Sequence, residues 1–363
     1  MNKEFWRGKR VLLTGHTGFK GAWLAIWLHE LGARVTGFSL PPIGDPNLFS
    51  MAGIAKLVDH HEGDLREFAQ VKDVVAGARP EIVVHMAAQS LVLESYADPV
   101  GTFATNVMGT VHLLEAIRQA GGVRAVLVIT TDKCYQNREW LWGYRETDRL
   151  GGHDPYSTSK ACAELVVAGY RQSFFDLQTY SRHGVALASA RAGNVIGGGD
   201  WSKDRLVPDV MRALAAGRRP LIRYPQAVRP WQHVLDPLRG YLMLIERMWT
   251  AAQDFAEAWN FGPPEASACS VGSIVQQLCA LWGDGAGWEC DESDRLHEAH
   301  YLKLDSSKAR ARIGWQPRWP LETALRKTVE AYRAKDIGEV VRRQIHEHSA
   351  AEPAIAAQGA SPA

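Results

Sequence analysis

One stretch near the amino terminus sets the class of fold: Val11-Leu12-Leu13-Thr14-Gly15-His16-Thr17-Gly18-Phe19-Lys20-Gly21. Its first residues are apolar, as in a buried strand, and residues 22–31 continue as a helix that ends near Gly32. Glycines let the backbone turn tightly between the two, and the free N–H groups at the helix start favour a phosphate. The stretch therefore predicts a dinucleotide site. The predicted cofactor contacts within it are Gly15, Thr17, Gly18, Phe19, Lys20 and Gly21.

The first half of the chain alternates short apolar runs with longer amphipathic ones. Strands are predicted at 11–13, 34–39, 82–86, 125–130 and 185–188, and helices at 105–120 and 156–170. This alternation is typical of a parallel sheet that helices cover on both faces. We therefore predict an α/β fold: a Rossmann-type doubly wound parallel sheet with a smaller, mainly C-terminal domain.

The pattern changes after Gly193, where glycines and prolines interrupt it. We predict that residues 1–192 form the dinucleotide-binding domain and that about 233–262 rejoin it through a strand at 258–261. Residues 193–335 are expected to form mainly the second domain, with short helices at 209–216 and 271–282. The tail 350–363 is rich in Ala, Pro, Gly and Ser and is expected to be disordered.

Composition narrows the classes of partner. The chain has 363 residues, 46% of them hydrophobic, and a net charge of +1, so bulk charge gives no sign of a nucleic-acid partner. No apolar run is long enough for a membrane span, and no membrane partner is expected. The five cysteines are scattered without a Cys-x-x-Cys pair, so no disulfide framework and no metal site is predicted. The polar amino terminus carries no signal core, which favours the cytoplasm.

The second strand bears on the choice of cofactor. It ends at Ser39 without the acidic residue that often binds the ribose, and no arginine follows to bind a 2′-phosphate. Ser39 can still hydrogen-bond a ribose hydroxyl, so NAD is favoured over NADP. Asp64 is open to two interpretations, an adenine contact or a helix N-cap in a capping box with Glu67. The further predicted cofactor contacts are Leu65, Ala87, Ala88 and Thr130.

Two polar clusters carry the chemistry. Thr131-Asp132-Lys133 follows the apolar strand 125–130, at the end where such a strand opens onto a ligand crevice. Tyr156 and Lys160 stand four residues apart and so share one helix face. Together these side chains suggest an enzyme that moves a hydride and also eliminates a group.

Three further polar residues, His85, Asn106 and Cys134, are interpreted as structural. The first two are expected to be satisfied by buried hydrogen bonds, and the third to be an inert buried thiol.

In these motifs the chain resembles the extended short-chain dehydrogenase/reductase family. The matching segments are Thr14-Gly15-x-x-Gly18-x-x-Gly21, Asp64-Leu65, His85-Met86-Ala87-Ala88, Asn106, Thr131-Asp132, Tyr156-x-x-x-Lys160 and Arg191-x-Gly193-Asn194-Val195-x-Gly197. Within that family the chain is similar to the nucleotide-sugar 4,6-dehydratases. Further segments point to the branch that acts on CDP-glucose: Thr131-Asp132-Lys133-Cys134-Tyr135, Gly198-Gly199-Asp200-Trp201, Arg229-Pro230-Trp231-Gln232-His233-Val234 and His300-Tyr301-Leu302-Lys303-Leu304-Asp305. Relatives that act on dTDP-glucose carry Thr-Asp-Glu where this chain has Thr131-Asp132-Lys133.

The resemblance implies a redox-neutral dehydration of CDP-glucose with NAD recycled in each turnover. Tyr156 would take the proton of the carbon 4 hydroxyl, with its pKa lowered by Lys160 and the oxidised nicotinamide. Lys160 would also hold the nicotinamide ribose, and Thr131 would hydrogen-bond the carbon 4 oxygen. Asp132 would protonate the departing carbon 6 hydroxyl. Lys133 would remove the carbon 5 proton, unless it only positions the sugar.

The same resemblance implies the substrate contacts and the assembly. The second domain would bind the nucleotide sugar, and the predicted substrate-binding residues are Gln89, Asn194, Arg205, Arg229 and Tyr301. A homodimer or homotetramer would form through the helices at 105–120 and 156–170. The product would serve deoxysugar synthesis for surface polysaccharide such as O-antigen.

Two alternatives stay open. The chain could be another enzyme of the family, such as a dTDP- or GDP-sugar dehydratase or an epimerase, although an epimerase needs no acid to expel water. It could also be a non-catalytic NAD-binding protein of the same fold. The retained Thr131, Tyr156 and Lys160 argue against that second alternative.

Overall fold

A computed structural model describes residues 1–291 and 302–352. Its centre is a seven-stranded sheet with the order β11-β6-β5-β4-β1-β2-β3, in which every neighbouring pair runs parallel. The strands are β1 Arg10–Thr14, β2 Arg34–Ser39, β3 Asp59–Glu62, β4 Ile82–His85, β5 Ala125–Ile129, β6 Ala186–Arg191 and β11 Ala258–Asn260. The predicted doubly wound parallel sheet is confirmed, and so is the returning strand at 258–261.

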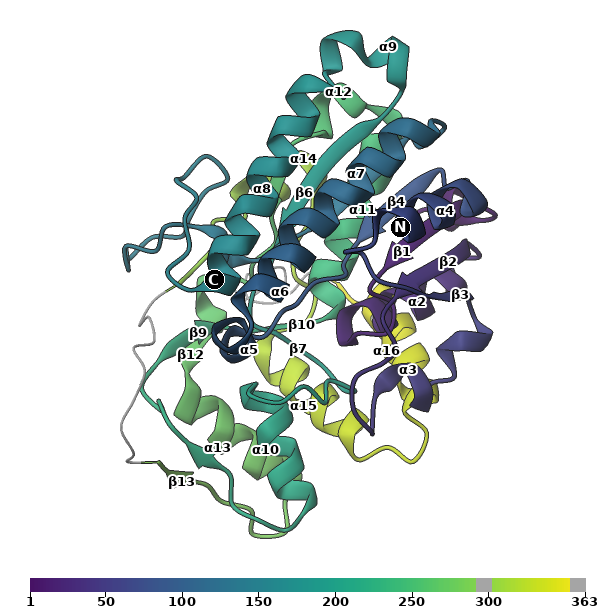
Figure 1. The fold of residues 1–363 in the computed structure, drawn as a ribbon. Coiled ribbons are helices and arrows are strands. Elements are labelled where there is room, and N and C mark those ends of the chain that lie inside the picture. Colours follow the sequence, from purple (N-terminus) through teal and green to yellow (C-terminus); the bar gives the residue numbers. More distant parts are fainter. Residues whose placement is uncertain (292–301, 353–363) are drawn as a thin grey trace, which may run out of the picture.

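Helices cover both faces of this sheet (Figure 1). On β1, Val11 and Leu13 face one core and Leu12 faces the other, because successive side chains of a strand point to opposite faces. The first core is covered by α2 Phe19–Glu30, α11 Leu235–Thr250, α14 Ser307–Ile313 and α16 Ile337–Ala350. The second is covered by α4 Phe68–Ala78, α7 Gly109–Ala120 and α8 Pro155–Ser173.

A third core lies apart from the sheet, in the lower part of Figure 1. It packs α10 Leu206–Ala215, α13 Val271–Trp282 and α15 Leu321–Tyr332. Three two-stranded pairs accompany these helices: β7 Val195–Ile196 with β10 Gln232–His233, β9 Val228–Pro230 with β12 Ala268–Ser270, and β8 Leu221–Ile222 with β13 Glu289–Cys290. The exact domain boundaries stay a prediction, and Trp315, Trp319 and α16 pack into the first core of the sheet.

Short elements complete the chain. They are α1 Lys3–Trp6, α3 Leu48–Met51, η1 Ile54–Lys56, α5 Val92–Ala97, α6 Pro99–Phe103, η2 Ala104–Met108, η3 Asp132–Cys134, η4 Leu177–Thr179, α9 Tyr180–His183, α12 Ala252–Phe255 and η5 Glu265–Ser267. The helix predicted at 105–120 is divided, because η2 is a turn of π-helix and only Gly109–Ala120 is α-helical. The tail predicted to be disordered at 350–363 begins too early, because Ala350 still belongs to α16, and its residues from 353 onward lie outside the described part of the chain.

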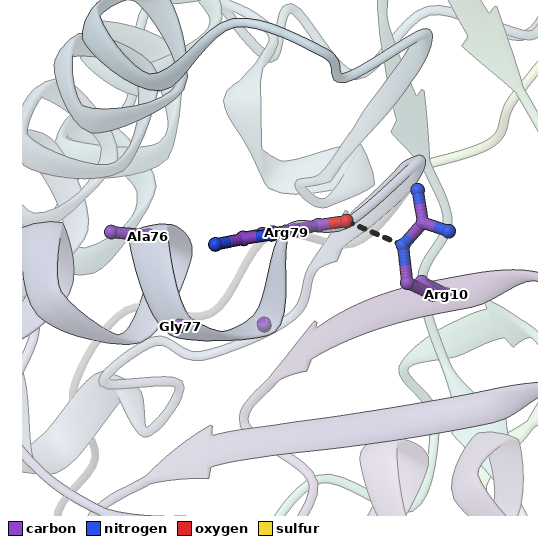
Figure 2. A pocket seen from close by; sticks show the side chains of 5 residues that line it. Arg10, Ala76, Gly77 and Arg79 are labelled. Atoms are coloured by element: carbon purple, nitrogen blue, oxygen red, sulfur yellow. Dashed lines mark hydrogen bonds between the residues drawn. The ribbon is translucent and has the colours of Figure 1, made fainter.

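A hollow at the amino ends of the strands, opposite the glycine turn, has no part in the predicted chemistry (Figure 2). Its lining residues are Arg10, Ala76, Gly77, Ala78 and Arg79, and its volume is about 580 Å³. The Nε of Arg10 donates to the carbonyl of Arg79 at 2.7 Å. Because Arg10 begins β1, this hollow is at the amino ends of the strands, whereas the glycine turn follows their carboxyl ends. None of the helices within 1–291 and 302–352 is long and apolar enough to cross a bilayer.

Candidate active site

The glycine turn after β1 is packed so closely that side chains would not fit. A Cβ on Gly15, whose φ is +77°, would lie 2.5 Å from the backbone nitrogen of Ala87. A Cβ on Gly21 would lie 2.0 Å from the carbonyl oxygen of Gly15. Gly18 caps α2 and offers no side chain to the first N–H groups of the helix. A turn of this kind, open at a helix N-terminus, fits the pyrophosphate of a dinucleotide.

Thr14 ties this turn to the end of β4. Its hydroxyl oxygen accepts from the backbone N–H groups of Met86 and Ala87, each at 3.2 Å, and lies 2.7 Å from Nδ1 of His85. The hydroxyl of Thr110 donates to a carbonyl, so it is left to accept from Nε2 of His85 at 3.2 Å. This network assigns a neutral His85, and burial together with the charge of Lys160 lowers its pKa to about 3. The structural role expected for His85 is confirmed.

The ribose end of the predicted cofactor site contains Thr17 and Ser39, whose hydroxyl oxygens lie 2.7 Å apart. Thr17 donates to the carbonyl of Leu40 at 2.9 Å, so the hydroxyl of Ser39 donates to Thr17. The oxygen of Ser39 keeps a free lone pair, which suits it to accept from a ribose hydroxyl.

The carboxylate of Asp64 hydrogen-bonds the nearby Arg66 and does not cap a helix. Its carboxylate accepts from the backbone N–H of Arg66 at 2.9 Å and from the guanidinium Nε at 2.8 Å. These hydrogen bonds hold the pKa of Asp64 below its ordinary value. The capping-box interpretation is wrong, because Glu67 is itself the N-cap of α4 and its side chain makes no capping bond. Leu65 is buried beside Gly109, and Ala88 is half-buried.

The Thr131-Asp132-Lys133 triplet forms the turn η3 directly after β5. The hydroxyl of Thr131 donates to Oδ1 of Asp132 at 2.9 Å, and Thr131 lies close enough to Tyr156 to act on the pKa of its phenol. Asp132 is buried, and burial raises its pKa against the opposing charge of Lys133. The raised pKa expected of a general acid is therefore found. Lys133 itself is exposed.

Gly193 leaves room for that carboxyl group. A Cβ there would lie 1.9 Å from Oδ2 of Asp132. The next residue, Asn194, has a φ of +48° and donates its side-chain Nδ2 to the same oxygen at 3.5 Å. Asn194, predicted to bind the substrate diphosphate, is therefore placed beside the acid.

Tyr156 and Lys160 are buried on one face of α8. Burial raises the pKa of Tyr156 to about 12, although Thr131 and the charge of Arg205 act to lower it. Burial lowers the pKa of Lys160 to about 8. The lowered pKa expected for the phenol is wrong for the protein alone, because desolvation outweighs the nearby positive charges. The further lowering of the Tyr156 pKa that an oxidised nicotinamide would cause stays a prediction.

Lys20 differs from the other predicted cofactor contacts. Its Nζ donates to the hydroxyl of Tyr241 on α11 at 3.2 Å. Burial and the charges of Lys160 and Arg205 lower its pKa to about 7. The ammonium is thus directed at Tyr241, and a contact with a dinucleotide rests on its backbone N–H at the start of α2.

The predicted substrate-binding residues differ in how close they lie to the predicted catalytic residues. Arg205 donates to Oδ2 of Asp200 at 3.0 Å and to Oγ of Ser90 at 2.7 Å, and so joins the two parts of the chain near Tyr156. Arg229 is buried, and its charge opposes the rise that burial causes in the pKa of Asp132. The amide of Gln89 is engaged within its own loop by Leu91 and Thr102. Tyr301 lies outside the described residues.

Two predicted structural residues occupy the expected places. Oδ1 of Asn106 accepts from the backbone N–H of Gln89, and Nδ2 donates to the carbonyl of Gln89 and to the hydroxyl of Ser159. The structural role predicted for Asn106 is confirmed. Cys134 is fully buried, and burial raises the pKa of its thiol well above the ordinary value, which confirms it as inert.

Sequence reasoning missed Glu164. It is buried on the Tyr156–Lys160 face of α8, pairs with Arg191 at 2.8 Å and accepts a short hydrogen bond from Thr130. The signal was its spacing, four residues after Lys160, which places the two on the same helix face.

Comparisons with known proteins identify the family of this chain. The family model described as GDP-mannose 4,6 dehydratase matches residues 12–328. A CDP-glucose 4,6-dehydratase of Salmonella typhimurium is 53% identical over 93% of this chain and 94% of that protein. A dTDP-glucose 4,6-dehydratase of Streptomyces griseus is 30% identical over 89% of this chain and 93% of that protein.

Solved structures show the same fold. The dTDP-glucose 4,6-dehydratase DesIV of Streptomyces venezuelae, with NAD and TYD bound, superposes with a TM-score of 0.77 at 24% identity, covering 89% of this chain and 97% of that one. A UDP-glucose 4-epimerase of Thermotoga maritima with UDP-glucose gives 0.77 at 22% identity, covering 89% and 98%. At these identities the likeness establishes the fold alone.

We predict that Gly193→Ala destabilises the protein by about 1–3 kcal/mol, because the new methyl group would occupy the space of the Asp132 carboxyl. The free energy of unfolding is measured in urea. Gly77→Ala is the control, since nothing lies within 4 Å of a Cβ there and Gly77 is inside α4. Equal stability of the Gly193→Ala variant and the wild-type protein would contradict the close approach.

Proposed function

Because this chain belongs to the GDP-mannose 4,6-dehydratase family, we propose that it is a hydro-lyase that converts CDP-glucose to CDP-4-keto-6-deoxyglucose with bound NAD. The observation that carries the proposal is the position of Thr131. Its side chain hydrogen-bonds Asp132, the group suited to elimination, and lies close enough to Tyr156, the group suited to oxidation, to act on the pKa of its phenol. A dehydratase needs both groups at one sugar, whereas an epimerase has no use for the acid.

The residues present fit NAD. The tight turn at Gly15 and Gly21 and the uncapped start of α2 suit the pyrophosphate, and Ser39 suits a ribose hydroxyl. When bound, NAD would accept a hydride from carbon 4 and return it to carbon 6. Lys160, whose Nζ lies 3.4 Å from the carbonyl of Ile129, would donate to the nicotinamide ribose.

Tyr156 would remove the proton of the carbon 4 hydroxyl. Its phenol is protonated near neutral pH in the protein alone, since its pKa is raised to about 12. Positive charge close to the phenol would therefore govern the step, and the residues that supply it are Lys160 on the same helix face and Arg205. Thr131 would orient the carbon 4 oxygen.

Asp132 would protonate the carbon 6 hydroxyl as it leaves. Its raised pKa favours the protonated carboxyl group that can donate, and Thr131 and Asn194 each hydrogen-bond one of its two oxygens. Lys133 is adjacent and exposed, and we propose that it accepts the carbon 5 proton or orients the sugar there.

The choice of CDP-glucose rests on the relative that is 53% identical across most of both chains. Arg229 and Arg205, which surround Asp132 and Tyr156 from the second part of the chain, would neutralise the substrate diphosphate. We further propose a cytoplasmic enzyme that serves deoxysugar synthesis for surface polysaccharide.

A homodimer or homotetramer is proposed from the helices at the front of Figure 1. Exposed apolar side chains gather along α5 to α8, where solvent contact is unfavourable unless a partner covers them. They are Tyr96, Val100, Met108, Leu165 and Phe174.

The substrate is tested by incubating the purified protein and NAD with CDP-glucose, dTDP-glucose and GDP-mannose separately. We expect a 4-keto sugar, detected by its absorbance in alkali, with CDP-glucose. Product from dTDP-glucose but not from CDP-glucose would refute the assignment of CDP-glucose as the substrate. The absence of product from all three nucleotide sugars would refute the dehydratase activity.

Two variants separate the two chemical steps. Tyr156→Phe should lower turnover by about 10²–10⁴-fold and leave the bound cofactor oxidised, because the carbon 4 proton has no acceptor. Asp132→Asn should instead let reduced cofactor accumulate, because elimination stops. Near-ultraviolet absorbance in a single turnover distinguishes them, and normal turnover by Asp132→Asn would refute the acid role.

For the assembly, Leu165→Glu should shift the protein to monomers in sedimentation velocity, because Leu165 is 60% exposed on α8. Leu221→Glu is the matched control, since Leu221 is 65% exposed on β8, away from these helices. An unchanged sedimentation coefficient in Leu165→Glu would rule this face out.

A further inference from the structure

The catalytic helix α8 carries a third buried polar residue in line with Tyr156 and Lys160. Glu164 follows Lys160 by four residues, so all three lie along one face of the helix. The side chain of Glu164 is 2% exposed. A buried carboxylate is costly unless it is paired and hydrogen-bonded, so its place beside the reacting groups needs an explanation.

Glu164 is the centre of a fully engaged cluster. One carboxylate oxygen, Oε1, accepts from the hydroxyl of Thr130 at 2.5 Å. The other, Oε2, accepts from Ser189 at 2.7 Å and from Arg191 at 2.8 Å. Burial acts to raise the pKa of Glu164, but Arg191 and these hydrogen bonds outweigh it and hold the pKa below the ordinary value. The group is therefore a carboxylate.

Glu164 and Lys160 reach the same two residues at the end of β5. The ammonium of Lys160 donates to the carbonyl of Ile129 at 3.4 Å, and Oε1 of Glu164 binds the side chain of the next residue, Thr130. Burial lowers the pKa of Lys160 to about 8, and the charge of Glu164 acts in the opposite direction. Without that carboxylate, Lys160 would lose its proton closer to neutral pH.

We propose that Glu164 is a positioning residue for hydride transfer: its carboxylate holds the end of β5 in place and keeps the ammonium of Lys160 charged. The proposal rests on the proposed function, in which a cationic Lys160 acts on Tyr156 and the nicotinamide ribose. It adds a group that touches neither substrate nor cofactor and acts through Lys160 alone.

Other titratable groups surround Lys160, and their charges favour this assignment. They are Tyr156 on the same helix face, Cys134 on η3, His85 on β4 and Lys20 on α2, with Asp132 near Lys20 and Arg191 paired with Glu164. Burial shifts the pKa values of Asp132, Cys134 and Tyr156 upward and that of His85 downward, so each shift favours the neutral form. Within this described set, Glu164 is the carboxylate whose pKa is held below its ordinary value.

The direct test is the ionisation of Lys160 in protein labelled with ¹³C-lysine, followed by NMR over pH without substrate or cofactor. The Lys160 signal is assigned by its loss in Lys160→Arg. We expect a midpoint of about 8 in the wild-type protein and, in Glu164→Gln, a midpoint lower by about one pH unit. An unchanged midpoint in Glu164→Gln would overturn the proposal.

Two controls separate charge from structure. Ser189→Ala removes one hydrogen bond to Glu164 but keeps its charge, so it should leave the Lys160 midpoint in place. Lys308, whose ammonium pairs with Glu257 and not with Glu164, should titrate unchanged in Glu164→Gln. Equal displacement of Lys160 in Ser189→Ala would mean that Glu164 is merely structural, and would overturn the proposal.

If Glu164→Gln does not fold, Glu164→Asp takes its place. It keeps the charge but withdraws it from Lys160 by one methylene, so the midpoint should fall by less and in the same direction. A folded Glu164→Asp with an unchanged or raised midpoint would overturn the proposal.

Turnover gives the second readout. In Glu164→Gln the alkaline limb of kcat/KM should move to lower pH by the same amount, because activity ends where Lys160 loses its proton. A moved NMR midpoint in a protein that turns over no nucleotide sugar would refute the proposed function and leave the charge relation intact. A moved midpoint with an unmoved alkaline limb in an active enzyme would refute the positioning role.

Discussion

Parallel pairing of β1, β4, β5 and β6 is the constraint on which the rest of this molecule depends. The registers run without interruption from Val11 opposite Ile82 to Ile129 opposite Ala190, so the four carboxyl ends open on one edge. The glycine turn, the Ala87 loop and the Thr131 triplet follow three of these ends, and the Gly193 loop follows the fourth. Residues far apart in sequence therefore meet without any segment having to cross the sheet.

Burial at that edge then sets the protonation of the reacting groups. The same loss of water raises the pKa of Asp132 and Tyr156 and lowers that of Lys160 and Lys20, because it disfavours every charged form. Specific partners decide which groups stay charged. Glu164 does so because Arg191 and two hydroxyl groups compensate its desolvation. The proposed dehydration needs an acid, a base and a cation within one site, and this division would provide them.

Much of the site was predictable because its elements are local in sequence. Glycines spaced by three between a strand and a helix identify a phosphate turn, and a Tyr and a Lys four apart identify one helix face. The local prediction for Asp64 was wrong, because Arg66 competes successfully for its carboxylate and Glu67 takes the helix cap.

The sequence by itself determined the doubly wound fold, the dinucleotide turn and the identities of the Thr131, Asp132, Tyr156 and Lys160 group, since periodicity and spacing act over a few residues. Only the tertiary structure decided the environments. Gly193 makes space for Asp132, Tyr241 draws the ammonium of Lys20 away from the turn, and Arg191 pairs with Glu164 across α8 and β6. These relations depend on desolvation and on contacts between distant segments, and both arise only when the chain is packed.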